Sequence, residues 1–148
     1  GYRTAVLRDD DRQPDSDEEK AFVKNGGDIF KWTDGWAIED ELFDCVSDAT
    51  VLNLWNHAKT FHGANLVVSH LKTACGKSID PADWFDDITD EKREALSTAS
   101  GQGKWFKRIA YMEVAAYESI GPNLKESRNP EFEQIVTEIY AWAENPGE

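Results

Sequence analysis

The stretch Val6-Leu7-Arg8-Asp9-Asp10-Asp11-Arg12 decides the fold that the sequence predicts. It begins as a short strand, predicted over residues 3–8, and runs directly into three carboxylates. Alternate side chains of a strand share a face, so Asp9 and Asp11 are predicted to project together where the strand ends. Two carboxylates held that close repel each other, and a divalent cation relieves the repulsion. Hard oxygen ligands favour Mg²⁺ or Mn²⁺ over zinc, so the stretch predicts a metal site.

This first strand opens a β-α-β unit. Ser16-Asp17-Glu18-Glu19 has the Ser-x-x-Glu pattern of a capping box and predicts the start of a helix. Gly26-Gly27 ends that helix, and Asp28-Ile29-Phe30-Lys31-Trp32 predicts a second strand. A β-α-β unit places two parallel strands side by side, with their C-terminal ends at one edge of the sheet.

Glu39 is the third predicted metal ligand. It stands in a second acidic stretch, Trp36-Ala37-Ile38-Glu39-Asp40-Glu41-Leu42-Phe43, after the second strand. Ligands of open α/β sheets gather outside the C-terminal ends of the strands, so we expect Glu39 to meet Asp9 and Asp11 there. The alternative for the Asp triplet is a solvated turn, where Asp is common because its side chain bonds to nearby backbone.

From Ile38 onward the chain is predicted to be helical. A mostly polar helix is predicted from Asp90 to Ser100, followed by a long helix over residues 105–120. The apolar residues of the long helix recur at the spacing of one buried face and are Trp105, Ile109, Met112, Ala116 and Ile120.

The predicted fold class is therefore α/β, with a partial parallel sheet followed by a mainly helical C-terminal half. Residues 1–45 are predicted to form the α/β unit that carries the acidic residues. Residues 46–148 are predicted to form a helical subdomain packed on it, with a frayed tail over residues 145–148.

Gly101-Gln102-Gly103-Lys104-Trp105-Phe106-Lys107-Arg108 carries three bases and no acid. The prediction places these bases at the start of the long helix, where the helix dipole favours anions instead. Free backbone N–H groups, a flexible Gly-x-Gly and three cations together predict a phosphate site. The alternative is that the bases pair with acids elsewhere on this acidic chain.

Composition limits the partners. The 148 residues carry a net charge of −13, which repels nucleic acid, so any DNA contact has to be local or metal-mediated. Cys45 and Cys75 fit no disulfide framework and indicate a reducing, cytoplasmic compartment. No apolar stretch approaches the length of a membrane span. The three histidines show no metal-ligand spacing and are expected at the core edge or in solvent.

These motifs resemble the C-terminal part of the ATP-dependent endonucleases of the OLD (overcoming lysogenization defect) family, which join an ABC-type ATPase to a Toprim nuclease domain. Residues 5–12 are similar to that family's strand plus Asp-x-Asp, and residues 36–43 to its later acidic Ile-Glu element. Gly103-Lys104-Trp105-Phe106-Lys107 is similar to its lysine-bearing segment. The resemblance spans most of the chain.

The resemblance implies a partial Toprim-like sheet and phosphodiester cleavage of DNA in phage defence. Asp9, Asp11 and Glu39 would bind one or two Mg²⁺ or Mn²⁺ ions, with one metal activating water and the second stabilising the leaving oxygen. Lys104 or Lys107 would neutralise charge on the scissile phosphate.

One departure from the family pattern is that a Toprim domain carries a glutamate on a strand upstream of Asp-x-Asp. Only eight residues precede Asp9 here. We therefore expect the chain to be a fragment whose parent protein supplies that strand and the ATPase, and to be inactive alone. A homo-oligomer is left open. The rival function is an acidic DNA mimic or protein-interaction module without catalysis, which would need carboxylates spread along an elongated face.

Overall fold

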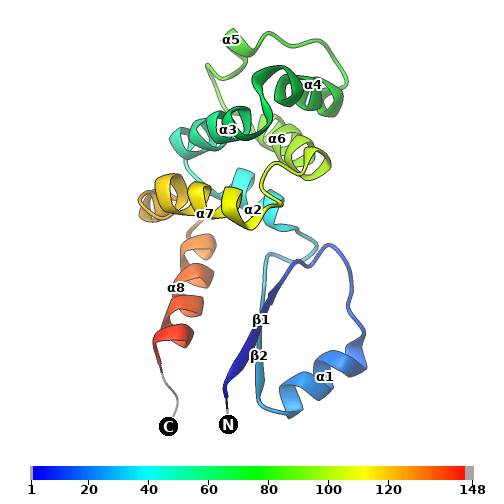
Figure 1. Ribbon diagram of the computed structural model, residues 1–148, viewed down its shortest axis with the longest axis vertical. Helices are drawn as coiled ribbons and strands as arrows, with labels where there is room; N and C mark the ends of the chain where they lie inside the picture. Colours follow the sequence, from blue (N-terminus) through cyan, green and yellow to red (C-terminus); the bar gives the residue numbers. More distant parts are fainter. Residues whose placement is uncertain (1, 146–148) are drawn as a thin grey trace.

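The computed structural model describes residues 2–145, so part of the tail expected to fray, residues 146–148, lies outside the described residues. The fold is mixed α/β and mainly helical, with a small two-stranded parallel sheet (Figure 1). In chain order the elements are β1 (Thr4–Arg8), α1 (Ser16–Lys24), β2 (Gly27–Lys31), α2 (Ile38–Cys45), α3 (Asp48–His62), α4 (Ala64–Cys75), α5 (Pro81–Trp84), α6 (Asp90–Gly103), α7 (Ile109–Ala115), a π-helical segment (Ala116–Ile120), a 3-10 turn (Leu124–Glu126) and α8 (Pro130–Glu144).

The predicted β-α-β unit is confirmed. β1 and β2 pair in parallel with Thr4 opposite Gly27, and both begin and end within one residue of the predicted strands. The start of α1 differs slightly, because Asp15 and not Ser16 is the N-cap, accepting hydrogen bonds from the next turn. Gly27 is required by packing, since a Cβ there would lie 2.3 Å from the Phe22 ring of α1.

The helical body is built around α6, which packs between α2 and α4 (Figure 1). The sequence predicts a mostly polar helix here, yet α6 buries one long face made mainly of small side chains. Ser and Ala let neighbouring helices approach closely, so this helix can be central while its composition stays polar. The buried residues of α6 are Arg93, Leu96, Ser97, Ala99 and Ser100.

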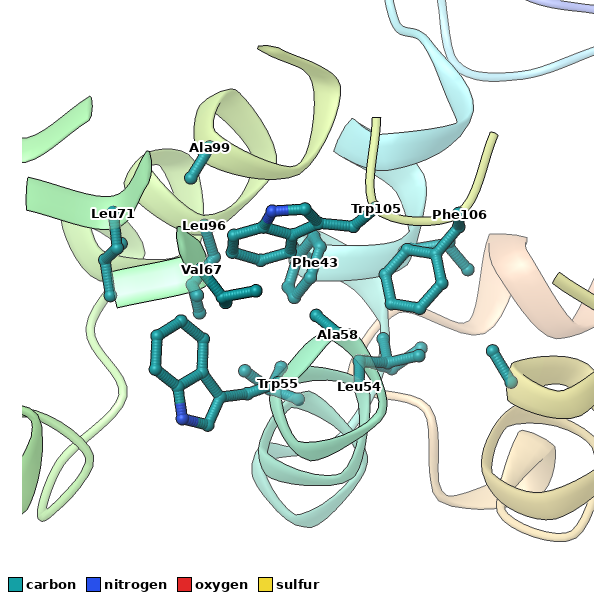
Figure 2. Close-up of a cluster of buried hydrophobic side chains, with 14 of the residues drawn as sticks. Phe43, Leu54, Trp55, Ala58, Val67, Leu71, Leu96, Ala99, Trp105 and Phe106 are labelled. Carbon is teal, nitrogen blue, oxygen red and sulfur yellow. The ribbon is translucent and has the colours of Figure 1, made fainter. Parts of the chain in front are cut away.

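Aromatic side chains fill the space between these helices (Figure 2). Trp105 is fully buried in the middle of the cluster, with its ring edge-on to Phe43 of α2 and Trp55 of α3. Edge-to-face pairs of this kind add about 0.5–1.5 kcal/mol beyond the area that they bury. The cluster therefore joins α2, α3, α4 and α6 to the turn that follows α6.

The predicted long helix over residues 105–120 is wrong in its first part. α6 continues through Gly103, and Trp105 lies in the turn before α7, not in a helix. Ile109, predicted to be buried, opens α7 and is 80% exposed. Trp105 reaches the core because the turn directs it inward. The prediction that Trp105 is buried is therefore confirmed, whereas the prediction that it lies in a helix is wrong.

The last helix, α8, returns to the sheet (Figure 1). Phe132 packs against Trp32 just beyond β2, and Trp142 packs edge-on against Phe30 and donates a hydrogen bond to Asp28. Because Phe30 and Ile29 point to opposite faces of β2, α8 and α1 cover opposite faces of the sheet. None of the helices described between residues 2 and 145 combines the length and the apolar character that a membrane crossing requires.

Candidate metal and phosphate site

The C-terminal end of β1 is tied directly to the start of α2. Asp9 Oδ1 accepts a hydrogen bond from the backbone N–H of Ile38 at 2.9 Å. Ala37, the N-cap residue of α2, has no side chain that can cap the helix, so Asp9 serves in its place. Asp10 N–H donates to the Trp36 carbonyl at 2.8 Å and holds the two segments together. These two bonds hold the end of β1 against the segment that leads into α2.

Asp10, between the two predicted ligands, is a structural residue. Its side chain is 5% exposed and accepts hydrogen bonds from Gly35 N–H at 2.9 Å and from Arg8 at 2.7 Å. The bond from Gly35, followed by those from Arg8, lowers the pKa of Asp10 below its ordinary value. Asp10 is thus buried at the bend that follows β1, whereas Asp9 and Asp11 on either side of it are exposed.

A second buried acid, Glu41, anchors the other end of the loop. It is 3% exposed, accepts a hydrogen bond from Thr33 N–H and accepts another from the Cys45 thiol at 3.2 Å. Burial, followed by the bond to Glu41, raises the pKa of Cys45, so its thiol stays protonated and unreactive. Nothing in the local sequence distinguishes Glu41 from its partly buried acidic neighbours.

Glu39, the third predicted ligand, lies in the first turn of α2. Burial raises its pKa above the ordinary value, a bond from its own backbone N–H opposes this, and the charge of Asp9 raises the pKa further. The positive charge of Lys107 lowers it. The Glu39 carboxyl group is therefore subject to the charges of both Asp9 and Lys107.

The geometry of α2 explains how Lys107 comes to this place. Glu39 and Phe43 are four residues apart and share one face of α2. Phe43 packs edge-on against Trp105, with ring centroids 6.3 Å apart. The turn that contains Trp105 and Lys107 is thereby held against the face of α2 that carries Glu39.

The turn at residues 104–108, here called the basic turn, begins with a Schellman motif. Lys104 N–H bonds to Gly101 O and Trp105 N–H bonds to Ser100 O, while Lys104 adopts the left-handed conformation with φ 54°. Lys104 thus lies at the C-terminal end of α6, where the helix dipole favours a cation. The prediction that it opposes a dipole at a helix N-terminus is wrong, and the Gly-x-Gly before it is helical.

The bases of the basic turn make no ion pair with any of residues 2–145. The carboxylates that pair with Lys or Arg do so with other bases, such as Arg8, Lys92 and Arg128. Arg108 instead lies over the Tyr111 ring at 5.5 Å. Within the described residues, these bases therefore form no ion pair with an acid of the same chain, although the charge of Lys107 acts on Glu39.

Of the five predicted site residues, Asp9 and Lys107 act on the charge of Glu39, and Asp9 is hydrogen-bonded to the start of α2. No described contact links Asp11 or Lys104 to these residues. Asp11 is exposed. Residues 2–145 contain no group of three or more His, Cys, Asp or Glu residues placed to hold a metal ion. Metal binding by Asp9, Asp11 and Glu39 together therefore stays a prediction.

Comparison with protein-family models, with curated proteins and with solved structures finds no match to this chain. The resemblance to OLD family endonucleases rests on the sequence motifs.

Proposed function

We propose that this chain carries the metal-binding carboxylates and phosphate-binding lysines of a Toprim-type DNA endonuclease. In this proposal the parent protein supplies an ABC-type ATPase and the upstream Toprim strand, and the whole acts in phage defence. Asp9, Asp11 and Glu39 bind Mg²⁺ or Mn²⁺. Lys104 and Lys107 bind the scissile phosphate.

The observation that carries the proposal is that Lys107 and Asp9 both act on the charge of Glu39, while Trp105 packs the basic turn against the same face of α2. A chain with 29 acids and 16 Lys and Arg residues has ample partners for its bases. The basic turn is nonetheless without ion pairs to the described residues, and its lysines are exposed. A phosphate bridging metal and lysine is the ligand that uses both charges.

The donor set fits a hard divalent cation. Asp9 uses only Oδ1 for the Ile38 N–H, and neither Asp9 Oδ2 nor the Asp11 carboxylate accepts a hydrogen bond from residues 2–145. Carboxylate oxygens of this kind, without sulfur or imidazole donors, suit Mg²⁺ or Mn²⁺. Such an ion would offset the repulsion between Asp9 and Glu39 and act as a Lewis acid toward phosphate.

Paramagnetic broadening by Mn²⁺ locates the ion without requiring activity. We expect titration of the 148-residue chain to broaden the amide resonances of Asp9, Asp11 and Glu39 first. Asp9→Asn should weaken this, and Asp10→Asn, the matched control, should change it less because Asp10 is turned inward. Broadening centred instead on the acidic groove between α2 and α6, lined by Asp40, Asp44, Asp90, Glu91 and Glu94, would overturn the metal assignment.

Cleavage of supercoiled plasmid by the parent protein tests the reaction itself. We expect nicking or linearisation that needs Mg²⁺ or Mn²⁺ and falls by about 10²-fold or more in Lys107→Ala. The 148-residue chain alone should bind metal weakly and leave the plasmid intact. If the parent protein does not cleave DNA, and this chain binds a DNA-binding protein without needing metal, the rival function as an acidic DNA mimic is favoured.

A further inference from the structure

We propose that His62 and His70 are positioning residues, which bond to the carbonyl and the indole of Trp105 and so fix the basic turn against the face of α2 that carries Glu39. This role rests on the proposed function, because it concerns the placement of Lys107. The two histidines and Trp105 are here called the clamp. In each of its two hydrogen bonds, the group on Trp105 can only accept or only donate, which fixes the role of the histidine nitrogen.

His62, the last residue of α3, bonds through Nε2 to the Trp105 carbonyl at 2.9 Å. A carbonyl oxygen only accepts, so His62 Nε2 carries the proton and donates. His70, in the middle of α4, bonds through Nδ1 to Trp105 Nε1 at 3.1 Å. An indole N–H only donates, so His70 Nδ1 is the acceptor and His70 is neutral in this arrangement.

The approach of His70 to Trp105 leaves no room for a side chain at the end of α6. A Cβ on Gly103 would lie 2.4 Å from His70 Nδ1 and 2.6 Å from Trp105 Nε1. Trp105 is fully buried and Phe106 is 3% exposed, so both aromatic residues of the turn point inward. The flanking bases Lys104 and Lys107 are then displayed outward from an anchored backbone.

The third histidine provides a natural control. His57 lies in α3 like His62, but bonds through Nε2 to Ser119 of the π-helical segment at 2.9 Å. It makes no described contact with the basic turn. A residue that merely stabilises the helical body should behave like His57, whereas a positioning residue should affect Lys107.

Zero-length cross-linking measures the placement of Lys107 without any activity assay. A carbodiimide couples a lysine amine to a carboxylate only when the two approach, and peptide mass spectrometry quantifies the Lys107–Glu39 and Lys107–Asp9 products. We expect His70→Leu to lower their yield about 5-fold or more. The Lys31–Asp34 product, from an ion pair of 2.6 Å, is the internal standard and should not change.

Conservative variants separate the hydrogen bond from the bulk of the ring. Asn places its carbonyl oxygen near the position of Nδ1, so His70→Asn should restore the yield. Gln places its amide N–H near the position of Nε2, so His62→Gln should restore what His62→Leu loses. His57→Leu should leave the yield at the wild-type level. If His70→Leu does not fold, His62→Leu carries the same test.

The two proposals fail in different ways. An unchanged Lys107 cross-link in both His62→Leu and His70→Leu overturns the clamp, whatever the cleavage assay shows. A reduced cross-link with no metal-dependent cleavage by the wild-type parent protein supports the clamp and overturns the proposed function. If the clamp and the proposed function both hold, His70→Leu should lower kcat of the parent protein by about 10–100-fold. In a protein that already carries Lys107→Ala, adding His70→Leu should not lower kcat further.

Discussion

Arg93 of α6 offers the sharpest test of how this fold is held together. Its guanidinium is 1% exposed and donates from Nη1 to the carbonyls of Phe43 and Val46, at 2.6 and 2.9 Å. It also donates to Asp48 at the start of α3. These carbonyls lie where α2 ends and the chain turns into α3, so Arg93 supplies donors that the helix itself lacks there.

The perturbation is Arg93→Met, which keeps an unbranched apolar side chain and removes every donor. The carbonyls of Phe43 and Val46 would then be buried without a partner, at about 1–3 kcal/mol each. We therefore expect a loss of about 2–6 kcal/mol in the free energy of unfolding. For a chain of this size, each kcal/mol corresponds to roughly 2–4 °C in Tm.

The control is Arg128→Met. Arg128 also reaches toward this region, pairing with Asp90 at 2.6 Å and Asp44 at 3.1 Å, but it is 40% exposed. Exposed pairs contribute about 0–1 kcal/mol, so its removal should cost little. Urea unfolding at pH 7 measures both variants. Equal losses, or a loss below about 1 kcal/mol for Arg93→Met, would refute the role of Arg93 as the donor for these carbonyls.

Two further predictions concern the candidate site. Folding raises the pKa of Glu39, so burying its ionised carboxylate lowers the stability of the wild type. Below the ordinary pKa of 4.5 the group is protonated in both states and this loss is absent. Above the raised pKa the loss is complete. In urea unfolding, Glu39→Gln should therefore be as stable as the wild type at pH 4 and more stable at pH 7. If variant and wild type differ by the same free energy of unfolding at both pH values, the difference does not come from ionisation of Glu39. Lys104→Gly should be as stable as the wild type or up to about 1 kcal/mol more stable, because relief of left-handed strain exceeds the entropy that Gly adds to the unfolded chain. Lys104→Ala removes the same charge without that relief. In the parent protein both variants should lose DNA cleavage to the same extent, and they should differ only in Tm. Retained cleavage would show that Lys104 is not part of the site.

The β-α-β unit could be predicted because local patterns determine it. A strand that ends in Asp-x-Asp, a helix and a second strand leave few arrangements of the chain. The Asp triplet gives no sign of which member is buried. The burial of Asp10 depends on a bond from Gly35, 25 residues further along the chain, and on one from the nearby Arg8.

The basic turn could not be predicted because its ending signal is atypical. A Schellman motif usually has Gly at the left-handed position, and here Gly101 and Gly103 are helical while Lys104 takes that conformation. Trp105 and Ile109 fit a helical period by chance, since the turn and not a helix directs Trp105 into the core. The histidines that hold it show no motif, because each acts through a single bond to Trp105.

The return of α8 to the sheet has a consequence for how the chain is made. Arg3 lies over the Trp142 ring at 4.7 Å and donates to its carbonyl, so the first strand is covered by the last helix (Figure 1). On the ribosome, β1, α1 and β2 emerge long before α8. At about 5–20 residues per second, Phe30 waits roughly 5–20 seconds for Trp142 to arrive. The helical body between them is complete before that time, so the nascent sheet is the segment that a chaperone would have to shield.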